Sequence, residues 1–370
     1  MIQKYPGNPI VKPTDVPPSR PGIRVLGAFN PGAIRFGEEV LLLMRVAERC
    51  EEQEGKVRMP FYRFAESTQL TESAQLAEST QLTESNQPDQ SGSHLEIMEL
   101  DASDPEVVLK DTRGVFYRGR DYLSTMSHIR LARSQDGFHF TVEEKPFIYP
   151  TNQSEEYSVE DARITFIDGR YYVNYTAVSR DSWATALAVT DDFRTVERKG
   201  LIFHPENKDV AIFPKKVGGK YIALHRPNNS GFGKASIWYS ESPDLLHWGN
   251  HRCLLRPRDN PWEAMKIGGG APPLKTPQGW LVIYHGKGEN SLYSLFCLLL
   301  DLEQPYKILK QASQPLLLPT ESYEAKGFFP NVIFSNGVVE MNGKVLIYYG
   351  AADESVCVAV TDLDYLLSTL

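Results

Sequence analysis

Two adjacent carboxylates, Glu160 and Asp161, stand at the start of a strand-like run of residues, and Arg163 follows them closely. An unpaired charge beside an apolar strand costs free energy, so these acids need either a turn exposed to solvent or a function. A carboxyl group held in such a place can act as a general acid or base. The pair is therefore either an ordinary turn or part of a catalytic site.

The sequence motifs of several other chemistries are absent. There is no His-Glu-x-x-His motif and no cluster of His and Cys, so a metal site is not expected. No Gly-x-Ser-x-Gly nucleophile motif is found. The glycine-rich stretch 266–276 lacks the spacing of a phosphate-binding loop and no helical pattern follows it, which argues against nucleotide binding. We therefore expect neither a metal nor an organic cofactor.

Five segments combine a turn with a run of β-branched and aromatic residues, as strands do. They begin at Gly37, Asp168, Gly218, Pro277 and Asn342. Each follows a short segment that often contains proline and precedes a third strand-like run, and these third runs recur about every 50 to 60 residues. No long amphipathic helix pattern alternates with the strands, as a TIM barrel requires. Unless generic hairpins recur by chance, the repeat predicts an all-β fold, a five-bladed β-propeller, as one domain over residues 1–370.

The innermost strands of a propeller line its central channel, so equivalent positions of the repeats converge there. The expected first strands carry Asn30, Asp161, Lys215, Lys216, Lys275 and Asn331, and the ends of the second strands carry Arg45, Thr176, Arg226, His285 and Gly350, followed by the acids Glu48 and Asp353. This gathering of polar groups favours a function for Asp161. His225 and Arg226 point to opposite faces of a strand, so both reach the channel only if the chain turns at Pro227.

A low-complexity segment interrupts the first repeat. Residues 66–89 repeat a six-residue unit of the type Glu-Ser-Thr-Gln-Leu-Thr, whose period fits neither a helix nor a coiled coil. Such a segment cannot bury enough apolar surface to offset the entropy that ordering costs. We expect residues 65–93 to form a disordered surface insert within the first blade.

Charge and composition exclude several classes of partner. The net charge of -8 argues against nucleic acid and anionic membranes as partners. The sequence contains no run of 18 apolar residues and no apolar core of a signal peptide, so we expect no membrane span and a cytoplasmic protein. The four cysteines show no Cys-x-x-Cys spacing, which indicates free thiols in a reducing compartment.

Long stretches of the sequence resemble glycoside hydrolase family 130, the mannoside phosphorylases and related β-mannosidases. The matching stretches include GAFNPGAIRF, SVEDARIT, NKDVAIFPKKVGGKYIALHRP, KIGGGAPPLKT and GFFPNVIFSNG, and the resemblance covers nearly the whole chain outside residues 65–93. It implies a five-bladed β-propeller that cleaves non-reducing-end β-mannosides with phosphate and inversion, giving α-mannose 1-phosphate. The sequence looks most like the branch that acts on β-1,2-linked mannosides. The implied partners are a small β-mannoside and phosphate, and a homo-oligomer is compatible with the family.

The resemblance also implies roles for individual residues. Asp161 matches the family's general acid, whose proton reaches the glycosidic oxygen through a mannose hydroxyl. The residues that match phosphate-binding positions are Arg45, Arg49, Lys216, His225 and Arg226, and those that match mannose-binding positions are Asn30, His285 and Asp353. Arginine and lysine suit phosphate because they form charge-assisted hydrogen bonds with its oxygens.

Two alternative functions stay open. An inverting β-mannosidase needs a second carboxylate to activate water, and Glu160 and Glu48 are the candidates. Family members that hydrolyse lose part of the basic set, whereas this sequence keeps it. A sugar-binding propeller without activity would lack the acid, whereas Asp161 is present. We therefore expect a phosphorylase, with phosphate as co-substrate.

Overall fold

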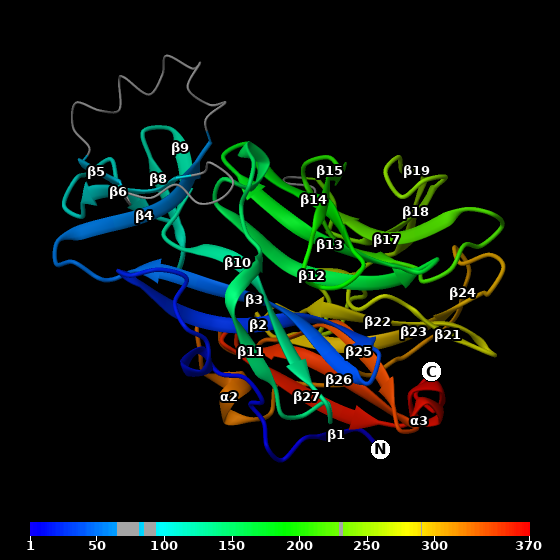
Figure 1. The fold of residues 1–370 in the computed structure, drawn as a ribbon. Coiled ribbons are helices and arrows are strands. Elements are labelled where there is room, and N and C mark those ends of the chain that lie inside the picture. The colour runs from blue at the N-terminus through cyan, green and yellow to red at the C-terminus, as the bar shows by residue number, and fades with distance from the viewer. Residues whose placement is uncertain (65–80, 85–93, 229–231, 290) are drawn as a thin grey trace.

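The repeats fold into five antiparallel units of four strands, named sheets 1 to 5, and the innermost strand of sheet 4 is split in two (Figure 1). A single parallel bridge between Ser127 and Ser158 joins sheets 1 and 2 into one eight-stranded sheet. The computed structural model describes residues 1–64, 81–84, 94–228, 232–289 and 291–370. Sheet 1 contains β2 (Ile23–Phe36), β3 (Glu39–Cys50), β10 (Met126–Ser134) and β11 (Thr141–Ile148). Sheet 2 contains β12 (Ser158–Ile167), β13 (Arg170–Ser179), β14 (Ser182–Thr190) and β15 (Glu197–Phe203). Sheet 3 contains β16 (Asn207–Ile212), β17 (Tyr221–Pro227), β18 (Ile237–Ser242) and β19 (Gly249–Leu255).

The last two sheets complete the set. Sheet 4 contains β20 (Lys266–Gly269) and β21 (Leu274–Thr276), which both pair with β22 (Gly279–Lys287), followed by β23 (Tyr293–Leu300) and β24 (Ile308–Gln311). Sheet 5 contains β25 (Ile333–Met341), β26 (Lys344–Ala351), β27 (Ser355–Thr361) and the N-terminal strand β1 (Gln3–Lys4). The pairing of β1 with β27 ties the N-terminal residues to the last sheet.

Apolar side chains between consecutive sheets make a ring of five hydrophobic clusters. Four clusters lie between sheets 1 and 2, 2 and 3, 3 and 4, and 4 and 5. The fifth packs Val356 and Val358 of sheet 5 against Val40 and Leu42 of sheet 1, all fully buried. This contact closes the ring, and the expected all-β propeller of five blades is confirmed.

The innermost strands β2, β12, β16 and β25 each contain a bulge at the same depth. The pairing register with the second strand shifts between Phe29 and Gly32, between Glu160 and Arg163, between Lys208 and Ala211, and between Phe334 and Gly337. Asn30, Asp161 and Asp209 lie in these bulges with φ of 47°, 53° and 55°. Asn and Asp tolerate this left-handed conformation better than most residues, and a bulge re-aims a side chain. The bulges therefore place three Asx side chains at one level of the ring.

Residues 51–125 form an insertion between β3 and β10 of sheet 1. It contains two small sheets, one of β4 (Lys56–Arg63), β5 (Gln81–Glu84) and β6 (His94–Asp101), the other of β7 (Val108–Leu109), β8 (Gly114–Tyr117) and β9 (Arg120–Leu123). The expected disordered segment 65–93 lies outside the described residues except for β5, which pairs with β6. Those four residues form a strand, although we expected no regular structure there.

Helices contribute little to the fold. The described residues form only short ones: η1 (Pro13–Asp15), η3 (Gln153–Glu155), α2 (Ser322–Ala325) and α3 (Leu363–Ser368). None of the helices in the described ranges is long and apolar enough to cross a membrane. All four cysteines are free thiols, as expected, and Cys50, Cys297 and Cys357 are buried.

Candidate active site

All five sheets and the insertion line one cavity of about 580 Å³. This volume lies within the range of roughly 300–1,000 Å³ that is typical of small-molecule sites. The polar and charged residues of its wall are Asn30, Arg45, Asp111, Arg113, Thr125, Glu160, Asp161, Lys208, Asp209, Arg226, Lys266, His285, Lys287, Ser291, Tyr293, Asn331 and Asp353. The bulged strands deliver Asn30, Asp161 and Asp209 to this cavity.

Asp161 is held by two donors from sheet 1. Its Oδ1 accepts a hydrogen bond from Asn30 Nδ2 at 3.0 Å and lies 3.5 Å from Arg45 Nη1. Asn30 is itself fixed, because Asn336 donates to its backbone oxygen at 3.1 Å and a Cβ at Gly350 would lie 2.2 Å from its Oδ1. Only 5% of the Asp161 surface is exposed, so little of this carboxyl group faces bulk water.

Glu160 is paired with two arginines. Its Oε1 accepts from Arg45 Nη2 at 2.8 Å and from Arg113 Nη1 at 2.7 Å, and the second of these comes from the insertion. Burial raises the pKa of Glu160, but the charges of Arg113 and Arg45 outweigh it and lower the pKa to about 2. Glu160 is therefore ionised and binds both guanidinium groups, of which that of Arg45 also lies 3.5 Å from Asp161.

Asp353, in the turn between β26 and β27, is a further buried carboxyl group of this cavity. Burial raises its pKa to about 6, although the charge of Arg45 opposes this rise, and the negative charge of Asp161 adds to it. Its φ of 51° places it in the left-handed region. Near neutral pH it can both accept and donate hydrogen bonds, which suits the hydroxyl groups of a sugar.

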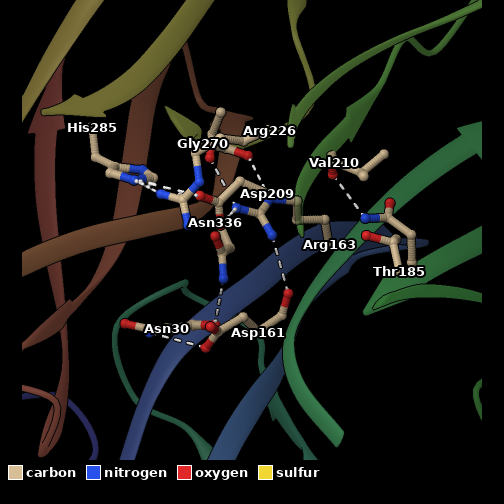
Figure 2. A network of polar contacts seen from close by, with 12 residues as sticks. Asn30, Asp161, Arg163, Thr185, Asp209, Val210, Arg226, Gly270, His285 and Asn336 are labelled. Atoms are coloured by element: carbon tan, nitrogen blue, oxygen red, sulfur yellow. Dashed lines mark hydrogen bonds and ion pairs between the residues drawn. The ribbon is translucent and has the colours of Figure 1, made fainter. Parts of the chain in front are cut away.

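A buried bridge of Arg163 and Asp209 separates the acid end of the cavity from a cationic end. Arg163 donates to the backbone oxygens of Asp161, Gly269 and Gly270 at 3.2, 2.9 and 2.8 Å. Its Nη2 lies 3.4 Å from Asp209 Oδ1. Figure 2 shows Asn30 and Asp161 at one end of this network, and Arg226 and His285 at the other.

Four cations from sheets 3 and 4 line the cavity: Lys208, Arg226, Lys266 and Lys287. Arg226 Nη1 lies 2.9 Å from Asp209 Oδ2, and Lys208 and Lys266 extend from neighbouring inner strands into the same cavity. Burial lowers the pKa of Lys266 to about 7, and the charges of Arg226 and Lys208 add to this effect. Such mutual repulsion indicates a cluster with more positive charge than its protein partners neutralise, as at an anion site.

His285 lines the same end of the cavity without adding a charge. It is fully buried, and its Nε2 lies 3.5 Å from Asp209 Oδ2 and 3.5 Å from Arg226 Nη1. Burial lowers the pKa of His285 well below its ordinary value. The ring is therefore neutral and suits a hydrogen bond to a hydroxyl group better than a contact with an anion.

The structure brings six of the nine expected site residues to the cavity wall. These are Asn30, Arg45, Asp161, Arg226, His285 and Asp353. Lys216 is exposed in the connection between β16 and β17, where its Nζ lies 4.4 Å from the centre of the Tyr221 ring. Glu48, the other acid considered, is a fully buried residue of β3 that accepts hydrogen bonds from Ser19 and lies 3.5 Å from His128 Nδ1.

His225 and Arg49 also lie away from the cavity wall. His225 faces the opposite side of β17 from Arg226, with Nε2 3.0 Å from His251 Nδ1 and its ring stacked on Phe203. Burial lowers its pKa to about 3, so it carries no charge for phosphate. The half-buried Arg49 donates from Nη2 to the backbone oxygen of Thr112 at 2.6 Å.

Comparison with known proteins identifies the family. A family model described as beta-1,4-mannooligosaccharide phosphorylase, of glycoside hydrolase family 130, matches residues 100–370. The chain belongs to glycoside hydrolase family 130. It is 41% identical over 356 residues to a beta-1,2-mannobiose phosphorylase of Listeria innocua, covering 96% of this chain and 94% of that one. It is 36% identical over 258 residues to a 1,2-beta-oligomannan phosphorylase of a Thermoanaerobacter species, covering 67% and 85%.

A solved structure supports the same assignment. The beta-1,2-mannobiose phosphorylase from Listeria innocua, in complex with beta-1,2-mannobiose, superposes on this family 130 chain with a TM-score of 0.89. The two chains are 40% identical, and the match covers 100% of this chain and 99% of that one. Among the residues that the structure describes, no group of three or more His, Cys, Asp or Glu side chains could hold a metal ion.

Sequence reasoning missed several wall residues of this family 130 chain. Lys208 and Asp209 occupy in β16 the places that Glu160 and Asp161 occupy in β12, and both bulges read Asp-x-x-Ile. This shared Asp-x-x-Ile pattern could have been recognised in the sequence. An alignment of the two segments on it would have placed Lys208, instead of Lys216, in the cavity. Lys266 at the start of β20 and Arg113 on the insertion carry no comparable signal, because only the folded chain brings them to the site.

Proposed function

We propose that this protein is an inverting glycoside phosphorylase that transfers the non-reducing-end mannose of a β-mannoside to inorganic phosphate. The observation that supports this most is the presence, in one cavity, of a buried acid and a group of four cations. The acid is Asp161, and the cations are Lys208, Arg226, Lys266 and Lys287. The products are α-mannose 1-phosphate and the shortened sugar.

Asp161 and phosphate act on opposite sides of the anomeric carbon in this proposal. A phosphate oxygen forms the new bond to that carbon while the bond to the glycosidic oxygen breaks. The departing oxygen takes up a proton that originates from Asp161. Lys208, Arg226 and Lys266 hold phosphate through charge-assisted hydrogen bonds and offset its negative charge as it approaches. Asn30, Arg45, His285 and Asp353 contact the sugar or orient the acid.

The ion pairs of Glu160 and Asp209 argue against either residue as the base of a hydrolase. An inverting hydrolase needs a carboxylate base that takes a proton from water. Glu160 shares its Oε1 between Arg45 and Arg113, and Asp209 lies between Arg163 and Arg226. A carboxylate with such partners is a weak base, because the charged form is already stabilised. Phosphate needs no such base, since it is already a nucleophile.

The linkage is proposed from similarity. The Listeria innocua relative is named for β-1,2-mannobiose and aligns over nearly the whole of this chain. We therefore propose β-1,2-linked mannobiose or oligomannosides as the substrate. A cytoplasmic location, expected from the free thiols, belongs to the same proposal.

Incubation with β-1,2-mannobiose, with and without phosphate, tests this function. We expect α-mannose 1-phosphate and mannose in equal amounts when phosphate is present, and almost no reaction when it is absent. The reverse reaction, from α-mannose 1-phosphate and mannose, should yield the disaccharide. Release of free mannose alone, at a rate independent of phosphate, would establish the hydrolase instead.

Phosphate binding is expected to weaken as the pH rises through about 7. Because the pKa of Lys266 is lowered to about 7, the free enzyme loses this cation progressively above that pH. Only the protonated amine attracts phosphate, so KM for phosphate should rise between about pH 7 and pH 9. Lys266→Arg keeps its charge over this range, and its KM should change less with pH. An identical pH dependence of KM in both proteins would contradict the role of Lys266.

A further inference from the structure

A second, smaller hollow of about 220 Å³ lies beside the active-site cavity, on the side of the insertion. Arg49, Arg58, Asp111, Thr112 and Ser124 are among the residues that line it. Asp111 lines both the hollow and the cavity, so the two spaces meet at this residue. Most of the residues that line the hollow are polar or charged, and it has no place in the reaction described above.

Arg49 stands at the boundary between the two spaces. Its Nη2 donates to the backbone oxygen of Thr112 at 2.6 Å, and its guanidinium lies 5.8 Å from the centre of the Phe328 ring. Phe328 lines the cavity but not the hollow, whereas Arg49 lines the hollow but not the cavity. The contact between Arg49, Thr112 and Phe328 therefore forms a partition next to Asp111.

The partition lies on the side where the departing sugar is expected. Arg113 of the insertion is bound to Glu160, the neighbour of Asp161, so the insertion covers the acid end of the cavity. Arg226, the cation that lies 2.9 Å from Asp209, is at the opposite end of the network from Asp161 (Figure 2). Since an acid and a nucleophile act on opposite sides of the anomeric carbon, the leaving sugar lies against the insertion.

We propose that Arg49 limits the length of the substrate by closing the acceptor side of the cavity towards the hollow. With the partition in place, a sugar unit beyond the departing one finds no room in this direction. Without it, the cavity and the hollow become one space, in which polar side chains such as Arg58, Asp111 and Ser124 can bind the hydroxyl groups of a further sugar unit. This inference rests on the proposed function, because it assumes that a mannoside occupies the cavity.

The test compares β-1,2-mannobiose with β-1,2-mannotriose as substrates of Arg49→Ala. We expect the ratio of kcat/KM for the trisaccharide to that for the disaccharide to rise about tenfold, a discrimination typical of one contact in a pocket. Phe328→Ala opens the partition from the other side and should shift the ratio in the same direction, which keeps the test decisive if one variant folds poorly. Arg58→Ala is the matched control, because Arg58 lines the hollow but binds Glu51 and Glu99. Its ratio should match that of the wild type.

Three outcomes would overturn the inference. The first is an unchanged ratio in folded Arg49→Ala and Phe328→Ala. The second is an equal change in Arg58→Ala. The third is a raised KM for phosphate in Arg49→Ala with no change in the ratio, which would restore the phosphate role expected from the sequence. Failure of the proposed function is a separate result, since a hydrolase would release mannose without phosphate, and its length preference could still be compared between the variants.

Discussion

The Asp161→Asn variant is expected to lose phosphorolysis by a factor of about 100 to 10,000, the usual contribution of a general acid. The amide has nearly the shape of the carboxyl group, and its oxygen can still accept from Asn30 and Arg45, which hold Oδ1 in the wild type. It cannot supply the proton that the departing oxygen needs. The measurements are turnover of β-1,2-mannobiose with phosphate and thermal unfolding, and the unfolding midpoint should stay close to that of the wild type.

Asp168→Asn provides the matched control for this prediction. Asp168 lies in the turn that follows the same strand, has a φ of 49° and is exposed, so it shares the residue type and backbone region of Asp161 without lining the cavity. Its turnover should equal that of the wild type. A folded Asp161→Asn protein that kept most of its turnover would remove Asp161 from the acid role.

The fold could be predicted from the sequence because the pattern that indicates each blade occurs five times. Turn glycines and strand-like runs recur five times in the same order, and a missed strand in one repeat can be recognised from the others. The strand boundaries were less predictable. Pro214 and the glycines after it resemble the end of a strand and its hairpin turn, which placed Lys216 on an inner strand, whereas β16 ends at Ile212.

The candidate site could be predicted where a side chain's direction follows from local rules. Arg226 and His225 are neighbours on β17, and strict alternation allows only one of them to face the cavity. The chain does not turn early enough at Pro227 to bring in both, and the structure selects Arg226. Arg113 could not be found in this way, because the insertion folds back on the ring and no strand pattern specifies where it docks.

Arg226→Ala is expected to have the largest effect on phosphate. Arg226 is 2% exposed and is the nearest cation to the buried Asp209, while Arg163 and His285 lie 3.4 and 3.5 Å from that carboxylate. Its removal takes away a charge-assisted contact of about 1.5–3 kcal/mol, which corresponds to roughly a ten- to hundredfold rise in KM for phosphate. KM for α-mannose 1-phosphate in the reverse reaction should rise similarly, whereas KM for the acceptor mannose should change little.

The same variant should also be less stable, because Asp209 then lacks its closest partner. Removal of one partner of a buried ion pair typically lowers the free energy of unfolding by about 3–5 kcal/mol, which thermal or urea unfolding would detect. Arg226→Lys keeps a charge beside Asp209 but loses the planar fork, so it should recover stability more than phosphate affinity. Lys216→Ala is the control, since Lys216 is exposed on a turn, and its KM for phosphate should equal that of the wild type. If Lys216→Ala raised this KM while folded Arg226→Lys and Arg226→Ala left it unchanged, phosphate would bind elsewhere than at the cations of this cavity.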